Sequence, residues 1–218
     1  MKNIHLVFDL DDTLIGYRPD SSGQKIQQEL ALLHEVPAED VHRMYKIIGA
    51  SADDGFSPDN LARAVHAEFP HVDYKKFSDD LHHAYSSALM VYSDTHELLD
   101  FARQKNITMS VVTAGNNEWQ RHKMNYTGIE ISDIHVTKNI EGKVAALAKI
   151  QAQMPDKKII FIDDYVRHLD EAHDAFGDEI ELYRMLRPTS RYAPLVSKYP
   201  HQGIESLAEL ITFLEERF

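Results

Sequence analysis

The stretch of sequence that decides the fold is Ile4-His5-Leu6-Val7-Phe8-Asp9-Leu10-Asp11-Asp12-Thr13-Leu14. It runs from apolar and β-favouring residues directly into a cluster of carboxylates, and then resumes with a threonine and a leucine. Strands of a buried parallel sheet are nearly continuous in apolar residues, so we expect a strand here that ends at the carboxyl edge of such a sheet. Open α/β folds bind ligands at that edge. The stretch therefore predicts an active site.

Asp9, Asp11 and Asp12 lie close together in sequence, and ionised carboxylates a few ångström apart repel one another. A divalent cation with oxygen ligands would offset that repulsion. An aspartate-rich turn after an edge strand is the alternative interpretation, because Asp favours turns and helix starts. The rest of the chain favours the active site, because it supplies the other parts of one in a workable order.

Composition limits the class of protein. The 218 residues, 43% of them hydrophobic, suffice for one domain or for a core domain with a smaller insertion. The chain has no cysteine, which excludes disulfides and thiolate metal sites. We find no membrane-spanning segment and no signal-peptide pattern, and so expect a soluble, cytoplasmic protein. The net charge of −12 argues against nucleic-acid or membrane partners but allows a small phosphorylated substrate.

Residues 17–88 show helical periodicity and no convincing strand. The apolar residues that share helix faces are Ile26, Leu30 and Leu33, then Val41, Met44, Tyr45 and Ile48, then Leu61, Val65 and Phe69, and last Tyr74, Phe77, Leu81 and Tyr85. We predict an all-helical inserted domain over 17–88, within a core domain of residues 1–16 and 89–218.

From residue 95 onward the pattern alternates between helix and strand. Strands are expected over 107–112, 134–136, 158–162 and 181–185, with helices over 95–103, near Trp119, and over 143–153, 166–176 and 204–214. Residues 187–203 look irregular. Such alternation predicts a doubly wound, parallel, Rossmann-like α/β sheet with right-handed crossovers.

Polar residues follow three of these expected strands. Asp9 and Asp11 follow the first, Thr113 follows a later one, and Asp163 and Asp164 follow another. In a parallel sheet these strand ends meet at one edge. Aspartate can attack phosphorus, a second carboxyl can transfer protons, and a hydroxyl, an ammonium and Mg²⁺ can hold a phosphoryl group. The set predicts phosphoryl transfer.

At this point the sequence resembles the haloacid dehalogenase-like hydrolase superfamily, whose members are mostly Mg²⁺-dependent phosphatases. The segment from Phe8 to Leu14 resembles its first motif, Val112-Thr113-Ala114-Gly115 its second, and Phe161-Ile162-Asp163-Asp164 its fourth in a double-Asp form. Gln120, Lys123 and Gly128 resemble a branch of small-metabolite phosphatases and nucleotidases with helical caps. The resemblance extends from residue 4 to about residue 175, and it makes the helical insertion a cap domain.

The resemblance implies roles for the first two motifs. Asp9 would be the nucleophile that forms an aspartyl-phosphate, and a ligand of Mg²⁺. Asp11 would be the general acid and base and would give its backbone carbonyl to the metal. Thr113 and the N–H groups near Ala114 would bind the phosphoryl group.

Roles for the distal residues follow in the same way. Lys143, at the expected start of a helix, is favoured as the phosphate-binding lysine, and Lys138 is the alternative. Asp164 fits the family's metal ligand best, with Asp163 beside it. The family commonly has an acid or amide a few residues further on, where this chain has His168, so the outer metal shell departs from the pattern.

The favoured function is a Mg²⁺-dependent phosphatase acting on a small phosphorylated metabolite. A dehalogenase or phosphonatase on the same scaffold is the nearest alternative, although those branches typically replace the second acid, which here is Asp11. A phospho-accepting signalling domain of the receiver type is a second alternative, and a catalytically inactive binding module is a third. The sequence indicates neither the substrate nor the oligomeric state.

Overall fold

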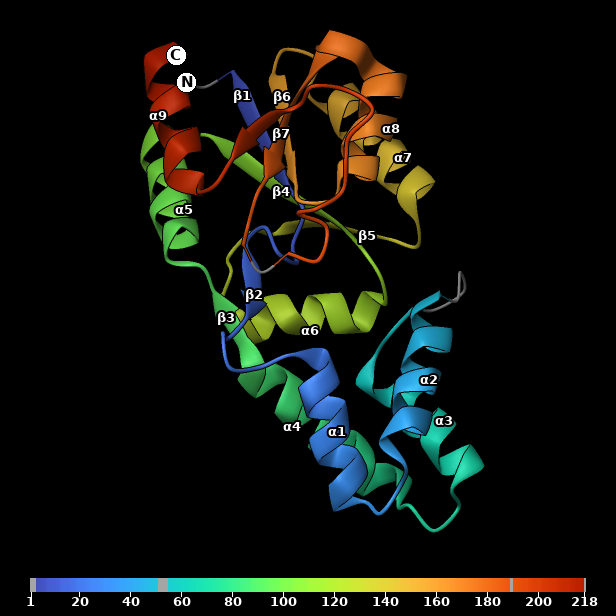
Figure 1. Ribbon diagram of the computed structural model, residues 1–218. Coiled ribbons are helices and arrows are strands. Elements are labelled where there is room, and N and C mark those ends of the chain that lie inside the picture. Colours follow the sequence, from blue (N-terminus) through green and yellow to red (C-terminus); the bar gives the residue numbers. More distant parts are fainter. Residues whose placement is uncertain (1–2, 51–54, 189, 218) are drawn as a thin grey trace. The chain divides into compact units, whose positions relative to one another are not determined.

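A computed structural model describes residues 3–50, 55–188 and 190–217 of the chain (Figure 1). The chain divides into two compact units. The first comprises Met1–Gly16, Val91–Ala114 and Glu130–Phe218, and the second Tyr17–Met90 and Gly115–Ile129. The predicted insertion, 17–88, lies within the second unit. That unit also contains Gly115–Ile129, which we predicted to be part of the core domain. None of the helices in the described part of the chain is long and apolar enough to cross a membrane.

The first unit is built on a sheet of six strands, all paired in parallel. Their order is β5 (Asp133–Thr137), β4 (Thr108–Ala114), β1 (Ile4–Phe8), β6 (Lys158–Asp163), β7 (Ile180–Met185) and β8 (Gln202–Ile204). Every residue of β1 is buried, as its continuous apolar sequence requires. In register, Phe8 lies beside Val111 of β4 and Ile162 of β6. The predicted parallel α/β sheet is confirmed.

Helices cover both faces of this sheet, as Figure 1 shows. α5 (Ser93–Lys105) and α9 (Leu207–Arg217) lie together on one side, and α7 (Ile140–Gln153) and α8 (Val166–Phe176) on the other. The core beneath α7 and α8 includes Val7, Leu147, Phe161 and Leu169, all fully buried. Burial of each such side chain contributes about 1.5–3 kcal/mol, so this cluster holds α7 and α8 against the sheet.

Some predicted boundaries were wrong. Ile204 lies in the short edge strand β8 and not in the terminal helix, which begins at Leu207. Three residues, one of them glycine, are too few to give a strand pattern. α7 begins at Ile140, where Asn139 caps it by accepting the N–H of Gly142 (2.9 Å). Lys143 therefore lies in the first turn and does not open the helix.

The second unit is helical. It contains α1 (Gly23–Leu33), α2 (Ala38–Ala50), α3 (Pro58–Glu68), α4 (Tyr74–Ala88) and α6 (Asn117–Thr127). Trp119 of α6 is buried in the same apolar cluster as Leu61 and Tyr85, with its ring 6.2 Å from that of Tyr85. The helix predicted near Trp119 thus contributes to the core of the helical unit.

A two-stranded sheet, which we did not predict, lies where the chain passes between the units. It pairs β2 (Ile15–Tyr17) with β3 (Leu89–Val91). A Cβ at Gly16 would come within 2.2 Å of the Tyr92 hydroxyl oxygen, so any larger residue would force the Tyr92 side chain to move. The end of the predicted first core segment, at residue 16, is thus a place where a side chain packs closely on the backbone.

A buried polar network surrounds His5 on β1. Ser110 donates to Asp133, so its oxygen accepts the N–H of His5 Nε2, 2.7 Å away. His5 Nδ1 then accepts the hydroxyl of Thr108 at 2.7 Å. Both nitrogens of the neutral imidazole are therefore hydrogen-bonded. Burial, with a smaller contribution from Lys157, lowers the pKa of His5 to about 4.

Acid is expected to destabilise the fold through His5. Below pH 6.5, the ordinary pKa of histidine, His5 binds a proton in the unfolded chain. In the folded chain His5 binds that proton only below about pH 4. The free energy of unfolding should therefore fall across that window, by about 3 kcal/mol from this residue. Urea unfolding of the wild type and of His5→Gln at several pH values measures this. An equally steep fall in the variant would contradict the prediction.

Candidate active site

Three buried aspartates meet at the carboxyl edge of the sheet. Asp9 follows β1, and its backbone N–H continues the ladder to β6 by donating to the carbonyl of Ile162 (2.8 Å). Asp163 ends β6 and Asp164 follows it. One carboxylate oxygen from each of the three aspartates lies within 4.8 Å of the others. The edge thus brings together acids that are far apart in the sequence.

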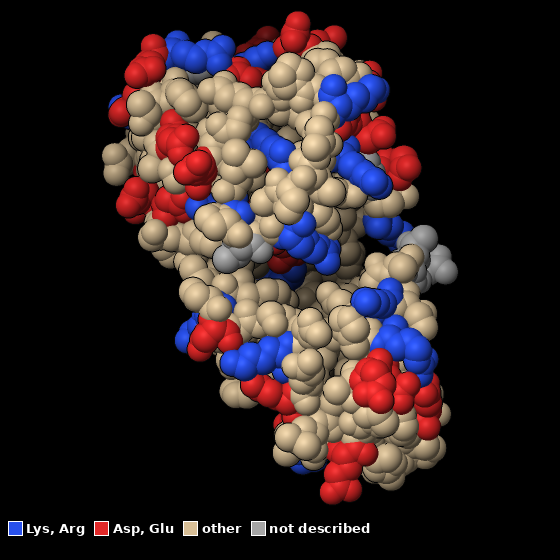
Figure 2. Space-filling view, viewed as in Figure 1, with Lys and Arg blue, Asp and Glu red and all other residues tan. Residues whose placement is uncertain are grey.

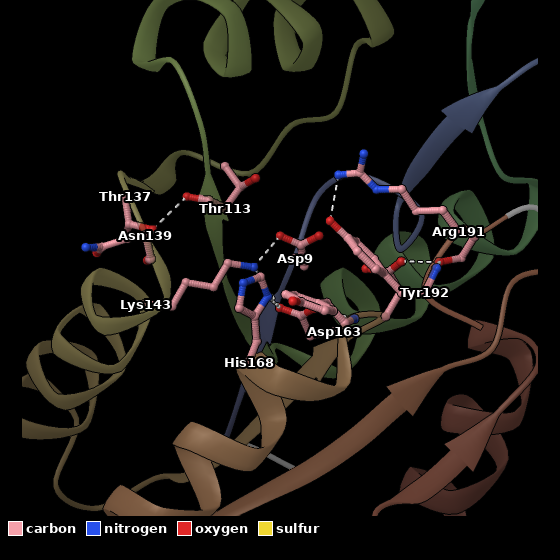
Figure 3. Close-up of polar contacts among 12 residues, drawn as sticks. Asp9, Thr113, Thr137, Asn139, Lys143, Asp163, His168, Arg191 and Tyr192 are labelled. Carbon is pink, nitrogen blue, oxygen red and sulfur yellow. Dashed lines mark hydrogen bonds and ion pairs between the residues drawn. The ribbon is translucent and has the colours of Figure 1, made fainter. Parts of the chain in front are cut away.

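Lys143 reaches this acid cluster from the first turn of α7. Its Nζ donates to Asp9 Oδ1 at 2.6 Å and to Asp163 Oδ2 at 2.7 Å, as Figure 3 shows. The lysine side chain is only 2% exposed, so both ion pairs are shielded from water. Lys138, the alternative lysine, is exposed.

The electrostatics of the cluster follow from burial and from this pairing. Burial raises the pKa of Asp9 to about 6, against the opposing effect of Lys143. Burial would raise the pKa of Asp163 too, but His168 and Lys143 outweigh it and bring that pKa to about 2. Burial lowers the pKa of Lys143, but Asp163 and Asp9 outweigh it and raise that pKa above its usual range.

Asp164 is the member of the cluster whose ionised form is least favoured. Burial, followed by the charges of Asp163 and Asp9, raises its pKa to about 8. The Lys143 ammonium pairs with Asp9 and Asp163 only, and three buried carboxyls this close together disfavour one another's ionised form. Such a set of oxygen donors fits a hard divalent cation, which would compensate the excess negative charge.

Three neighbouring groups hydrogen-bond to Asp163. Its Oδ1 accepts the backbone N–H of Tyr165 (2.8 Å), and its Oδ2 accepts from Lys143 and lies 2.9 Å from His168 Nδ1 (Figure 3). The departure from the family pattern at His168 therefore has a structural consequence. The imidazole lies in the first turn of α8 and contacts Asp163 of the distal acid pair.

The chain after Asp9 forms a tight turn. The N–H groups of Leu14 and Ile15 both donate to the carbonyl of Leu10, at 3.0 and 3.1 Å. Asp12 has a positive φ of 54°, and its carboxylate accepts the Tyr92 hydroxyl at 3.5 Å. Asp11 lies in this turn, half-buried, two residues after the fully enclosed Asp9. Figure 3 places Asp9 at the centre of the cluster.

The end of β4 lies at the same edge. Thr113 is buried and Ala114 half-buried, and in register they lie beside Val136 and Thr137 of β5. The Thr137 hydroxyl donates to the Thr113 carbonyl at 3.3 Å (Figure 3). The second motif is therefore held at the edge by pairing with its neighbour strand.

Sequence reasoning missed the segment after β7, which was expected only to be irregular. Arg187 is buried there and forms a bidentate pair with Asp94, at 2.7 and 2.8 Å. It donates as well to the carbonyl of Thr13 at 3.0 Å. Ser190 donates to Asp164 Oδ2 at 2.5 Å. No periodic or motif signal marks these residues, since their partners are distant in sequence.

Comparisons with solved structures show the same fold. A protein from Burkholderia xenovorans, described as a haloacid dehalogenase-like hydrolase, superimposes with a TM-score of 0.78 at 16% identity, over 99% of this chain and 98% of that one. A defluorinating L-2-haloacid dehalogenase gives 0.69 at 13%, over 97% and 95%. A protein from Thermotoga maritima described as a β-phosphoglucomutase gives 0.62 at 16%, over 99% and 100%.

The residues matched by a protein-family model include the acid cluster. No curated protein matches the chain. The family model of haloacid dehalogenase-like hydrolases matches residues 6–180, a range that includes Asp9, Thr113, Lys143 and the distal acid pair. The family predicted from the motifs is confirmed, and the chain belongs to the haloacid dehalogenase-like hydrolases.

Proposed function

We propose that this hydrolase is a Mg²⁺-dependent phosphatase that cleaves a phosphate monoester of a small metabolite. The observation that carries the proposal is a second carboxyl, Asp11, two residues after the buried Asp9. An ester releases an alkoxide, which needs a proton, whereas a halide leaves without one. Asp11 therefore favours ester hydrolysis over dehalogenation, although the similar structures include a haloacid dehalogenase as well as a protein described as a β-phosphoglucomutase.

In the proposed reaction, a carboxylate oxygen of Asp9 attacks phosphorus and forms an aspartyl-phosphate, while the P–O bond to the leaving group breaks. Asp11 gives its proton to the departing oxygen. It then takes a proton from the water that hydrolyses the aspartyl-phosphate and restores Asp9. Burial of Asp9 keeps bulk water away from the nucleophile, and its bond to Lys143 favours the ionised form.

Phosphoryl binding is assigned to Thr113, to the backbone near Ala114 and to Lys143. The burial of Lys143 and its 2.6 Å bond to Asp9 support it over the exposed Lys138. An ammonium beside the attacking oxygen can shift part of its hydrogen bonding to a phosphoryl oxygen as negative charge develops there.

Cation binding is assigned to Asp9 and Asp164, with the backbone carbonyl of Asp11. Asp163 already accepts from three donors, so we assign it to holding Lys143 and His168 in place, beside the cation. When bound, Mg²⁺ would neutralise the acids and stabilise the charge that builds up on the phosphoryl oxygens.

A small metabolite is proposed as the substrate because of the charge of the protein. The net charge is −12, and on the face drawn in Figure 2 the Lys and Arg side chains lie interspersed with Asp and Glu. A phosphate polymer is held by clustered basic residues, whereas one phosphoryl group needs only the donors of the site.

A substrate panel tests this function. The purified chain with Mg²⁺ is expected to release phosphate from at least one sugar phosphate or nucleoside monophosphate, and to lose that activity in EDTA. Halide release from L-2-chloropropionate, measured in parallel, is the comparison. Halide release without phosphate release would favour the dehalogenase alternative, and inactivity on both panels would contradict a hydrolytic phosphatase.

A further inference from the structure

We infer that Ser190 is a positioning residue that holds Asp164 in the orientation required to bind the cation. The inference rests on the cation-binding part of the proposed function. Ser190 is 5% exposed and belongs to none of the motifs of the family. Its Oγ donates to Asp164 Oδ2 at 2.5 Å. The proposed metal ligand is therefore held by a side chain that lies 26 positions later in the sequence.

The partners of Ser190 leave its hydroxyl proton for Asp164. Ser190 Oγ accepts the backbone N–H of Tyr192 at 3.1 Å, and because the ionised carboxylate that binds a cation can only accept, the hydroxyl donates to it. A charge-assisted donor on one oxygen of Asp164 restrains the rotation of the carboxylate and so orients its other oxygen. Replacing a residue that orients a metal ligand in this way typically lowers the affinity for the metal 10- to 100-fold.

The segment that carries Ser190 is anchored on both sides. Before it, Arg187 is fixed by Asp94, and the Arg187 carbonyl accepts the N–H of Ser190 at 3.0 Å. After it, the Tyr192 ring stacks on that of Tyr165, the residue that follows Asp164, with centroids 4.1 Å apart. The hydroxyl is therefore held in place before any cation arrives, which reduces the entropic cost of ordering the ligand.

The same segment contains a matched control. Ser197 repeats the arrangement, donating to Asp170 Oδ1 at 2.6 Å and accepting the N–H of Tyr199 at 3.2 Å. Asp170 is outside the acid cluster. Replacing Ser197 removes an equivalent pair of hydrogen bonds without touching a proposed metal ligand.

Mn²⁺ binding to the full chain, followed by electron paramagnetic resonance of free Mn²⁺, tests the inference. Ser190→Ala is expected to weaken binding by about tenfold. Ser197→Ala should stay within about twofold of the wild type, and Asp164→Ala should lose the site. Melting curves of all variants check that they are folded.

Wild-type affinity in Ser190→Ala would overturn the inference, as would equal weakening in the two serine variants, because loss of order in the segment would then explain both. Failure of the wild type to bind Mn²⁺ would overturn it together with the proposed metal site. Mn²⁺ binding that depends on Ser190, in a chain that hydrolyses no phosphate ester, would refute the phosphatase alone.

Discussion

Replacing Asp9 by asparagine is expected to lower the rate of phosphate release by at least about a thousandfold, since a nucleophile is removed and activity then rests on binding alone. Asparagine has nearly the same shape, and its amide oxygen can still accept from Lys143, which lies 2.6 Å from Asp9 Oδ1. The loss would therefore be chemical. Initial rates at saturating Mg²⁺ measure it, and intact-mass analysis of the quenched wild type should reveal phosphorylated protein that the variant lacks.

Asp12→Asn is the matched control, three residues further on. Asp12 accepts the Tyr92 hydroxyl and belongs to the turn rather than to the acid cluster. We expect this variant to keep activity within about tenfold of the wild type, because the asparagine amide oxygen can still accept the Tyr92 hydroxyl and only a charge outside the acid cluster is removed. Retention of full activity by Asp9→Asn would remove the basis of the proposed mechanism.

Arg187→Ala is expected to cost about 3 kcal/mol of stability. The guanidinium is 7% exposed and binds both oxygens of Asp94, so its loss leaves a buried carboxylate without its cation. The N–H of Leu207 still donates to Asp94 at 2.8 Å, which limits the cost. For a chain of this size, that loss lowers the melting temperature by about 6–12 °C.

Arg103→Ala provides the comparison for this stability measurement. Arg103 bridges Asp100 and Glu130, but its side chain is 44% exposed. Exposed ion pairs contribute less than about 1 kcal/mol, so this variant should unfold close to the wild type in urea. Similar losses of stability in the two variants would mean that the buried Arg187–Asp94 pair contributes no more than an exposed ion pair.

The sheet could be predicted because its central strands have a simple pattern. The apolar run before Asp9 and the one before Asp163 are buried on both faces, and burial on both faces leaves a continuous signal in the sequence. Once both were expected to be parallel strands, their acids had to lie at one edge.

Other features have no such local signal. Ser190 and Arg187 depend on partners 26 and 93 positions away, and the sequence of residues 187–203 has no helix or strand periodicity. α6 was expected in the core domain, because a helix between two strands normally packs on their sheet. Its Trp119 packs with Tyr85 instead, which the spacing of residues within α6 does not indicate.

The central position of β1 has a consequence for synthesis of the protein. β1 leaves the ribosome before the other strands of its sheet, yet both of its neighbours, β4 and β6, come more than a hundred residues later, and Lys143 lies 134 positions after Asp9. At 5–20 residues per second, Asp9 waits about 7–27 s for its lysine. The apolar strand must stay unpaired throughout, so the growing chain is most exposed to aggregation before its active site can assemble.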